Sequence, residues 1–271
     1  MTGPFPPRDW SRIYWPDVSA ASTARWIAVL PLAATEQHGP HLPLGTDTAI
    51  AQAYLARVRE TLARTIPASF LPVQEVGLST EHIAYPGTLT LPYHVAIRSW
   101  LALGESVARA GVRKLVMVTS HGGNSDAMAL VAQELRCRNN MLVVTTSWSR
   151  FGVPEGLFPD DELRHGIHGG AVETSIMLAA DPQSVRTDRI GNFTPSSIAM
   201  EKEFNRLSTR RPAPFAWTAQ DLNASGAAGD ATLASAEKGR LLIEHGAKAF
   251  CELLADVDAF DLARLDTAPK V

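Results

Sequence analysis

The stretch K-L-V-M-V-T-S-H-G-G-N, residues 114–124, contains the clearest strand signal in the sequence. Five of the six residues at 114–119 are apolar or β-branched. A glycine pair follows at residues 122–123, and then a helical pattern at residues 125–138. A short apolar run that ends in a glycine-containing turn before a helix is typical of a buried strand in an α/β protein. His121 lies just after this predicted strand, where ligands bind in such folds.

The same alternation of strand and helix extends from this unit in both directions. We expect further strands at residues 26–32, 70–76 and 141–146, and helices at residues 46–62, 91–110, 169–180 and 231–257. This order favours an α/β fold with a mostly parallel sheet and helices on both faces. We predict a single-domain, three-layer α/β/α structure over residues 1–271. Thr46 is a candidate cap for its helix.

Residues 183–229 lack helical or strand periodicity and are rich in Ser, Thr, Pro and Asn. An irregular stretch of this length inside a domain is usually functional or partly disordered. Residues 192–226 are therefore a candidate lid over a site.

Composition excludes several classes of function. The chain has 271 residues, 45% of them hydrophobic, and a net charge of -3, so we expect no nucleic-acid partner. No apolar run reaches the roughly 18–20 residues of a membrane span, and residues 1–10 hold three prolines and no signal-peptide core. We expect a cytoplasmic protein. Cys137 and Cys251 form no C-x-x-C motif and are expected to be buried or half-buried thiols.

The chemistry-bearing residues begin just past the first predicted strand. Glu36 and His38 are two apart, so in an extended chain both face one point while Gln37 points away. Glycines and prolines between residues 39 and 45 allow the chain to turn back. Asp47, in the first turn of the next helix, can then return to the same point.

Two later segments add further imidazoles and a carboxylate. His121 belongs to residues 120–124, and His168 precedes a helix whose first turn contains Glu173. The set Glu36, His38, Asp47, His121 and Glu173 suits a pair of zinc or manganese ions. Each residue alone has a commoner structural explanation, such as a hydrogen-bonded histidine or a helix-start carboxylate, so the interpretation rests on their joint occurrence.

Three motifs give the chain a family resemblance. T-E-Q-H-G-P-H-L-P-L-G-T-D-T at residues 35–48, H-G-G-N at 121–124 and H-G-G-A-V-E-T-S at 168–175 resemble the creatininase (creatinine amidohydrolase) family. Weaker similarities include S-T-E-H at residues 79–82, and the match covers about residues 25–245. The resemblance implies a creatininase-like fold and a homo-oligomer, often a hexamer. It also implies two divalent ions per chain, Zn²⁺ or Mn²⁺, with Fe²⁺ as a further option.

The resemblance also assigns roles. It implies that Glu36 and His38 bind different ions, that Asp47 bridges them, and that His121 shares the ion of Glu36. His168 takes the position of a proton-transfer residue. Creatininase itself has a metal-binding Glu two residues after the histidine of the second motif, where this chain has Gly123. The missing carboxylate is therefore assigned to Glu173, as in relatives that carry H-G-G-N.

The predicted function is metal-dependent hydrolysis of a C–N amide bond by a metal-activated hydroxide, with His168, Glu173 and Asp47 as catalytic residues. The substrate would be a small cyclic amide, a formamide or a related molecule. One alternative is a metal-dependent peptidase of a peptide-derived cofactor pathway. Another is a non-catalytic protein that binds an anion at residues 120–124. His41 and His82 could orient ligands, and Trp148 and Trp217 could line a pocket; a structural role is equally open for each.

Overall fold

The computed structural model describes residues 5–210 and 212–265, so residues 1–4 of the N-terminal stretch lie outside it. Its centre is a four-stranded sheet of order β2-β1-β3-β4 in which all neighbours are parallel. The strands are β1 (Ile27–Leu32), β2 (Ala68–Phe70), β3 (Lys114–Thr119) and β4 (Leu142–Ser147). The parallel sheet predicted from the sequence is confirmed.

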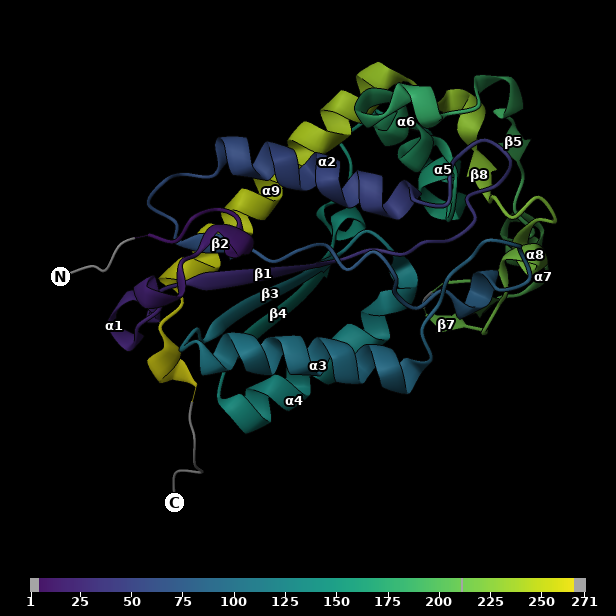
Figure 1. Cartoon of the computed structure of the whole chain (residues 1–271). Helices are drawn as coiled ribbons and strands as arrows, with labels where there is room; N and C mark the ends of the chain where they lie inside the picture. The colour runs from purple at the N-terminus through teal and green to yellow at the C-terminus, as the bar shows by residue number, and fades with distance from the viewer. Residues whose placement is uncertain (1–4, 211, 266–271) are drawn as a thin grey trace.

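Helices cover both faces of this sheet (Figure 1). One face carries α3 (Tyr93–Arg109) and α4 (Ser125–Asn139); the other carries α2 (Thr46–Thr61), α6 (Ala171–Ala180) and α9 (Ala236–Ala259). Every residue of β1 and β3 is buried, which explains their continuous apolar character. Val29 packs toward α2 and α9, whereas the neighbouring Leu30 packs toward α3 and α4. The three-layer arrangement is therefore also confirmed.

Some predicted boundaries are wrong, each for a local reason. The second strand ends at Phe70 instead of continuing to residue 76, because Pro72 has no N–H to donate to a ladder. Helix α9 begins at Ala236 rather than residue 231, because the Ser235 side chain caps it by accepting from the N–H of Lys238. Thr46 does not cap α2; its hydroxyl donates to the carbonyl of Pro43.

The stretch expected to be irregular contains short elements that lie together beyond the carboxyl ends of the strands (Figure 1). They are β5 (Asn192–Phe193), α7 (Ser197–Glu203), β6 (Leu207–Ser208), β7 (Ala213–Pro214), α8 (Ala219–Leu222) and β8 (Gly229–Asp230). The remaining short helices are α1 (Ala20–Thr23), α5 (Asp160–His165), η1 (Trp10–Arg12), η2 (Trp15–Asp17), η3 (Thr80–His82), η4 (Gly122–Asn124), η5 (Trp148–Phe151), η6 (Pro182–Ser184), η7 (Thr187–Arg189), η8 (Ala231–Leu233) and η9 (Leu262–Arg264).

Two further expectations concern the surface. Across residues 5–210 and 212–265, no helix combines the length and the apolar character needed to cross a bilayer. Both cysteines are free thiols, and Cys251 is half-buried as expected, but Cys137 on α4 is exposed.

Candidate metal centre

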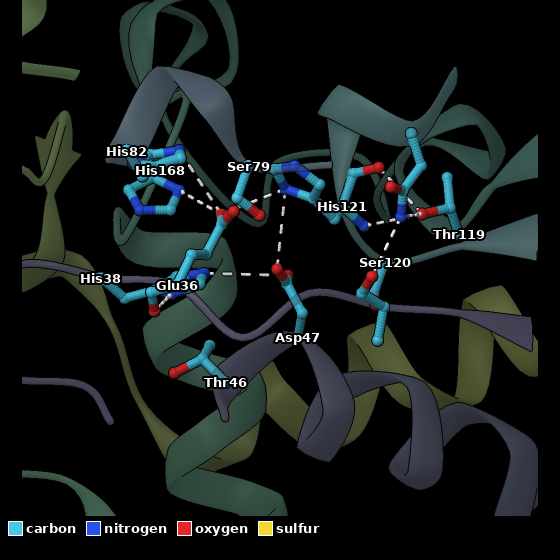
Figure 2. Close-up of polar contacts among 12 residues, drawn as sticks. Glu36, His38, Thr46, Asp47, Ser79, His82, Thr119, Ser120, His121 and His168 are labelled. Carbon is cyan, nitrogen blue, oxygen red and sulfur yellow. Dashed lines mark hydrogen bonds and ion pairs between the residues drawn. The ribbon is translucent and has the colours of Figure 1, made fainter. Parts of the chain in front are cut away.

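The predicted ligand residues converge at the carboxyl edge of the sheet, and Figure 2 shows all of them except Glu173. Glu36 and His38 lie in the loop after β1, and Asp47 lies in the first turn of α2. His121 directly follows Ser120 at the end of β3, and Glu173 lies in the first turn of α6. Parallel strands place their carboxyl ends side by side, which is why residues up to 137 positions apart meet here.

Asp47 stands between two groups of donor atoms. Its Oδ2 lies 3.6 Å from Nδ1 of His121, which in turn lies 3.1 Å from Oε1 of Glu36. Its Oδ1 lies 3.7 Å from Nε2 of His38, which lies 3.9 Å from Oε2 of Glu173. Each group offers three nitrogen or oxygen atoms close enough together for one cation, and Glu36, His38 and His168 form a third such group that overlaps both. Asp47 thus belongs to both of the first two groups, and its bridging role stays a prediction.

Most of the donor atoms on Glu36, His38 and Asp47 are buried without hydrogen-bond partners, whereas Oε2 of the half-buried Glu173 accepts from the N–H of Gly169. Both carboxylate oxygens of Glu36, Nε2 of His38 and Oδ2 of Asp47 have no hydrogen bond within the described structure. Glu36 and His38 are completely buried, and Asp47 is 1% exposed. Unpartnered buried polar groups are costly, and a cation would satisfy these atoms together. Imidazole nitrogens and carboxylate oxygens suit zinc or manganese, so the residues fit such ions.

The protonation of the metal-free cluster follows from the same contacts. Burial alone would lower the pKa of His38, but Asp47 and Glu173 raise it to about 9. Burial opposes ionisation of Glu36, yet the facing His121 holds its pKa well below the ordinary value. Burial raises the pKa of Asp47. The imidazole of His38 is therefore protonated near neutral pH, and a cation bound beside it would displace that proton.

His168 lies beside this cluster and is held in one tautomer. Its Nε2–H donates to the backbone carbonyl of Gln37 over 2.5 Å, so the unprotonated Nδ1 faces Oε1 of Glu36 at 3.7 Å. Burial, with His38 and His82 nearby, lowers the pKa of His168 to about 3. The imidazole is therefore neutral and has a free lone pair near the predicted ions.

The backbone around His168 is fixed by two contacts. His168 exchanges hydrogen bonds with Ala228 in both directions, N–H to carbonyl, at 3.1 and 2.7 Å. The buried carboxylate of Glu162 accepts from the N–H groups of Ala171 and Asp230, each at 2.7 Å. This carboxylate joins the loop that carries His168 to the chain before α9. Glu162 was not singled out from the sequence.

A hydrogen bond joins Gln37 to His82, and His82 lies beside Glu36. In the sequence, only the weak S-T-E-H similarity pointed to His82. The amide of Gln37 is oriented because its oxygen accepts from Gly39 N–H and its nitrogen donates to the carbonyl of Gly226. The same nitrogen donates to Nδ1 of His82 at 2.8 Å. His82 therefore carries its proton on Nε2, which lies 3.4 Å from Oε1 of Glu36.

The other uncertain residues have separate places. Nε2–H of His41 donates to the hydroxyl of Thr174, and its ring stacks on Phe193, so it holds α6 and is not a cluster member. Trp148 is 4% exposed and stacks on Tyr54 at 4.4 Å between ring centroids. Both Trp148 and Trp217 also line cavities at the cluster.

Two cavities meet at the donor cluster. The first, of about 500 Å³, is lined by Glu36, Asp47, Glu81, His121 and, from the stretch proposed as a lid, residues 215–218. The second, of about 600 Å³, has a largely apolar wall that includes Tyr54, Trp148, Val153, Leu163, Ile176 and Leu242. His168 and Glu173 line both cavities. A molecule at the cluster can therefore extend in two directions.

Comparison with known proteins points to one family. The chain matches the family model "Creatininase: Creatinine amidohydrolase" over residues 11–254. It is 33% identical over 230 residues to a mycofactocin precursor peptide peptidase of Mycobacterium ulcerans, covering 82% of each chain. It is 29% identical to the creatinine amidohydrolase of Pseudomonas putida, covering 80% of this chain and 84% of that one.

A solved structure described as "Creatininase Mn" superimposes with a TM-score of 0.74 and 25% identity. The alignment covers 92% of this chain and 98% of the other. Family model, relatives and fold agree with the motifs found in the sequence, and the chain belongs to the creatininase family.

Proposed function

We propose that this protein is a dinuclear metal-dependent amidohydrolase that cleaves a C–N amide bond. The observation that carries the proposal is the sharing of Asp47 between two donor groups beside a cavity. Glu36, His121 and Asp47 would hold one ion; His38, Asp47 and Glu173 would hold the other. Zn²⁺ or Mn²⁺ suits these donors, and Fe²⁺ is compatible with them. Such ions lower the pKa of water and polarise a carbonyl when bound.

His168 supplies the proton transfer in this proposal. Its free Nδ1 accepts a proton from the attacking water as the new C–O bond forms. The same Nδ1 then gives that proton to the departing nitrogen as the C–N bond breaks, so the products are a carboxylic acid and an amine. The hydrogen bond from Nε2 to Gln37 keeps Nδ1 directed at the cluster throughout. General acid and base assistance of this kind contributes about 10²–10⁴-fold to rates.

Peptide-bond hydrolysis is a second candidate, favoured by the paired cavities. A linear amide with a bulky apolar group on one side of the scissile bond would place that group against Trp148, Val153 and Leu163. A small cyclic amide would leave most of this space unused. The 33% identical relatives named as mycofactocin precursor peptide peptidases support this candidate.

Anion binding at residues 120–124 is the weaker alternative. The side chain of Asn124 is fully buried and bonds to Leu78, Ala33 and Thr119, so it does not face a ligand. Carboxylates also line the adjoining cavity and would repel a phosphate or sulfate.

The first test is elemental analysis of protein purified without chelator, as wild type and Asp47→Ala. The expected result is about two zinc or manganese ions per wild-type chain and loss of most of both in the variant. A wild type that binds neither ion, even after their addition, rules out the proposal. Hydrolysis of creatinine, formamides and short peptides with apolar residues, compared on the loaded enzyme, then separates the two hydrolytic candidates. From the family resemblance we also infer a homo-oligomer, often a hexamer, whose size light scattering measures.

A further inference from the structure

The side chain of His121 presents its two nitrogens to different surroundings. Nδ1 faces Glu36 and Asp47, which makes it the atom that would bind an ion. Nε2 points the other way and lies 2.6 Å from the carbonyl of Leu78 and 3.3 Å from Oε1 of Glu81. With Nδ1 as ligand, Nε2 carries the proton and donates to the carbonyl of Leu78, and the carboxylate of Glu81 lies beside the same nitrogen as its ion-pair partner.

Glu81 reaches His121 through space that a side chain at residue 123 would fill. A Cβ on Gly123 would lie 2.6 Å from Oε1 of Glu81, 2.4 Å from Nε2 of His121 and 2.6 Å from the carbonyl of Leu78. All three distances are too short for carbon, and one partner is backbone. Gly123 is therefore the residue that leaves room for the Glu81 carboxylate.

We propose that Glu81 is the positioning carboxylate of His121 and takes the space that the glycine at residue 123 leaves empty. The inference rests on the proposed function, because it concerns a ligand of the proposed metal centre. Glu81 belongs to η3 (Thr80–His82), a segment separate from the loop that carries His121. A carboxylate that accepts from the second nitrogen of a ligating histidine fixes the tautomer and ring orientation, and raises the basicity of the ligating nitrogen.

The neighbouring residue of the same turn acts on the other side of the same ion site. Nε2–H of His82 lies 3.4 Å from Glu36, while Glu81 lies 3.3 Å from His121. One short 3-10 turn thus contacts both Glu36 and His121, two of the three donors of one proposed ion. Removal of Glu81 should accordingly lower the affinity for that ion and leave the affinity for the ion at His38 and Glu173 unchanged.

The test measures metal affinity by chelator competition in the full-length protein for wild type, Glu81→Ala and Glu81→Gln. Loss of an outer partner of this kind typically costs about 10–100-fold in affinity. We expect that loss for one of two ions in Glu81→Ala, and a smaller loss in Glu81→Gln, which keeps an acceptor oxygen. At saturating Co²⁺ the visible absorption of Glu81→Ala should also differ from wild type, because the orientation of the His121 ligand changes.

Asp126 supplies the matched control. It lines the same cavity in the first turn of α4, but the described structure places no hydrogen bond or ion pair between it and His121. Asp126→Asn should keep both affinities within about twofold of wild type. An unchanged affinity in Glu81→Ala, or an equal loss in Asp126→Asn, overturns the inference. Either result leaves the proposed function standing if wild type still binds two ions, whereas a wild type without metal removes the proposed function itself.

Discussion

Oδ2 of Asp47 lies 3.6 Å from Nδ1 of His121, and this contact ties the start of α2 to the end of β3. The other oxygen of the same carboxylate faces His38. One side chain thus contributes to both donor groups, and neither group is complete without it. Several consequences can be measured.

Metal removal should lower the melting temperature of the wild type. Donor atoms of Glu36, His38 and Asp47 are buried and unpartnered without cations, so ions bind the folded state selectively. Free ion at about 1,000 times Kd contributes roughly 4 kcal/mol, which corresponds to a shift on the order of 10 °C. Differential scanning fluorimetry with and without chelator measures the shift. Asp47→Asn should show almost none; a wild type insensitive to chelator would contradict the prediction.

His168→Ala should lower kcat by about 10²–10⁴-fold while the metal content stays near that of wild type. The reason is that Nδ1 of His168 faces the cluster with a free lone pair. Steady-state kinetics and elemental analysis of the same sample make the measurement. His41→Gln is the control, because His41 is equally buried but bonds to Thr174 instead. Loss of metal in His168→Ala would show that this histidine is a ligand.

Trp148→Ala should destabilise the fold by about 3–5 kcal/mol, the usual cost of removing a large aromatic side chain from a core. Trp148 packs on Tyr54 and Phe250 and is 4% exposed. Urea unfolding followed by circular dichroism gives the change. Trp15→Ala, at a residue 86% exposed, should stay within about 0.5 kcal/mol of wild type. Equal effects in the two variants would show that Trp148 has no core role.

Glu162→Gln should cost about 1–3 kcal/mol, because one of its two N–H partners would face an amide NH₂ group instead of an oxygen. Of those partners, Ala171 follows the loop that carries His168, and Asp230 lies two residues after Ala228, to which His168 is hydrogen-bonded. The same urea experiment measures the loss, and kcat should fall with it as the loop loosens. Glu155→Gln, at an exposed position, is the control. A stable but inactive Glu162→Gln would point to a direct chemical role.

The sequence was sufficient to predict the parallel sheet and the convergence of the predicted ligand residues. Continuous apolar runs identify β1 and β3 because both strands are buried on two faces. The residues just past their carboxyl ends must then lie near one another, which predicted the meeting of Glu36 with His121. Asp47 followed from the helical pattern that begins beside it.

Other parts depend on contacts that no local pattern encodes. Glu81 sits in a short motif, but its contact with His121 exists only because Gly123, 42 residues later, lacks a side chain. The hydrogen bonds of Gln37 to His82 and Gly226 likewise join three separate loops. The short elements after residue 183 are held by pairings such as that of β5 with β8. A strand of two residues is too short to show a periodic pattern, so the sequence does not predict it.

The bonds between His168 and Ala228 also set the order in which the protein can assemble. All four strands of the central sheet have been synthesised once the chain reaches Ser147. The backbone of His168 can be fixed only after Ala228 has been synthesised. Helix α9, which covers the apolar face that includes Val29 and Val116, comes later still. Until α9 has been synthesised, only α2 and α6 can cover this face, and the part that α9 would cover stays exposed. Exposed faces of this kind promote aggregation, so chains that stop before residue 236 should accumulate as insoluble protein rather than as soluble, inactive enzyme.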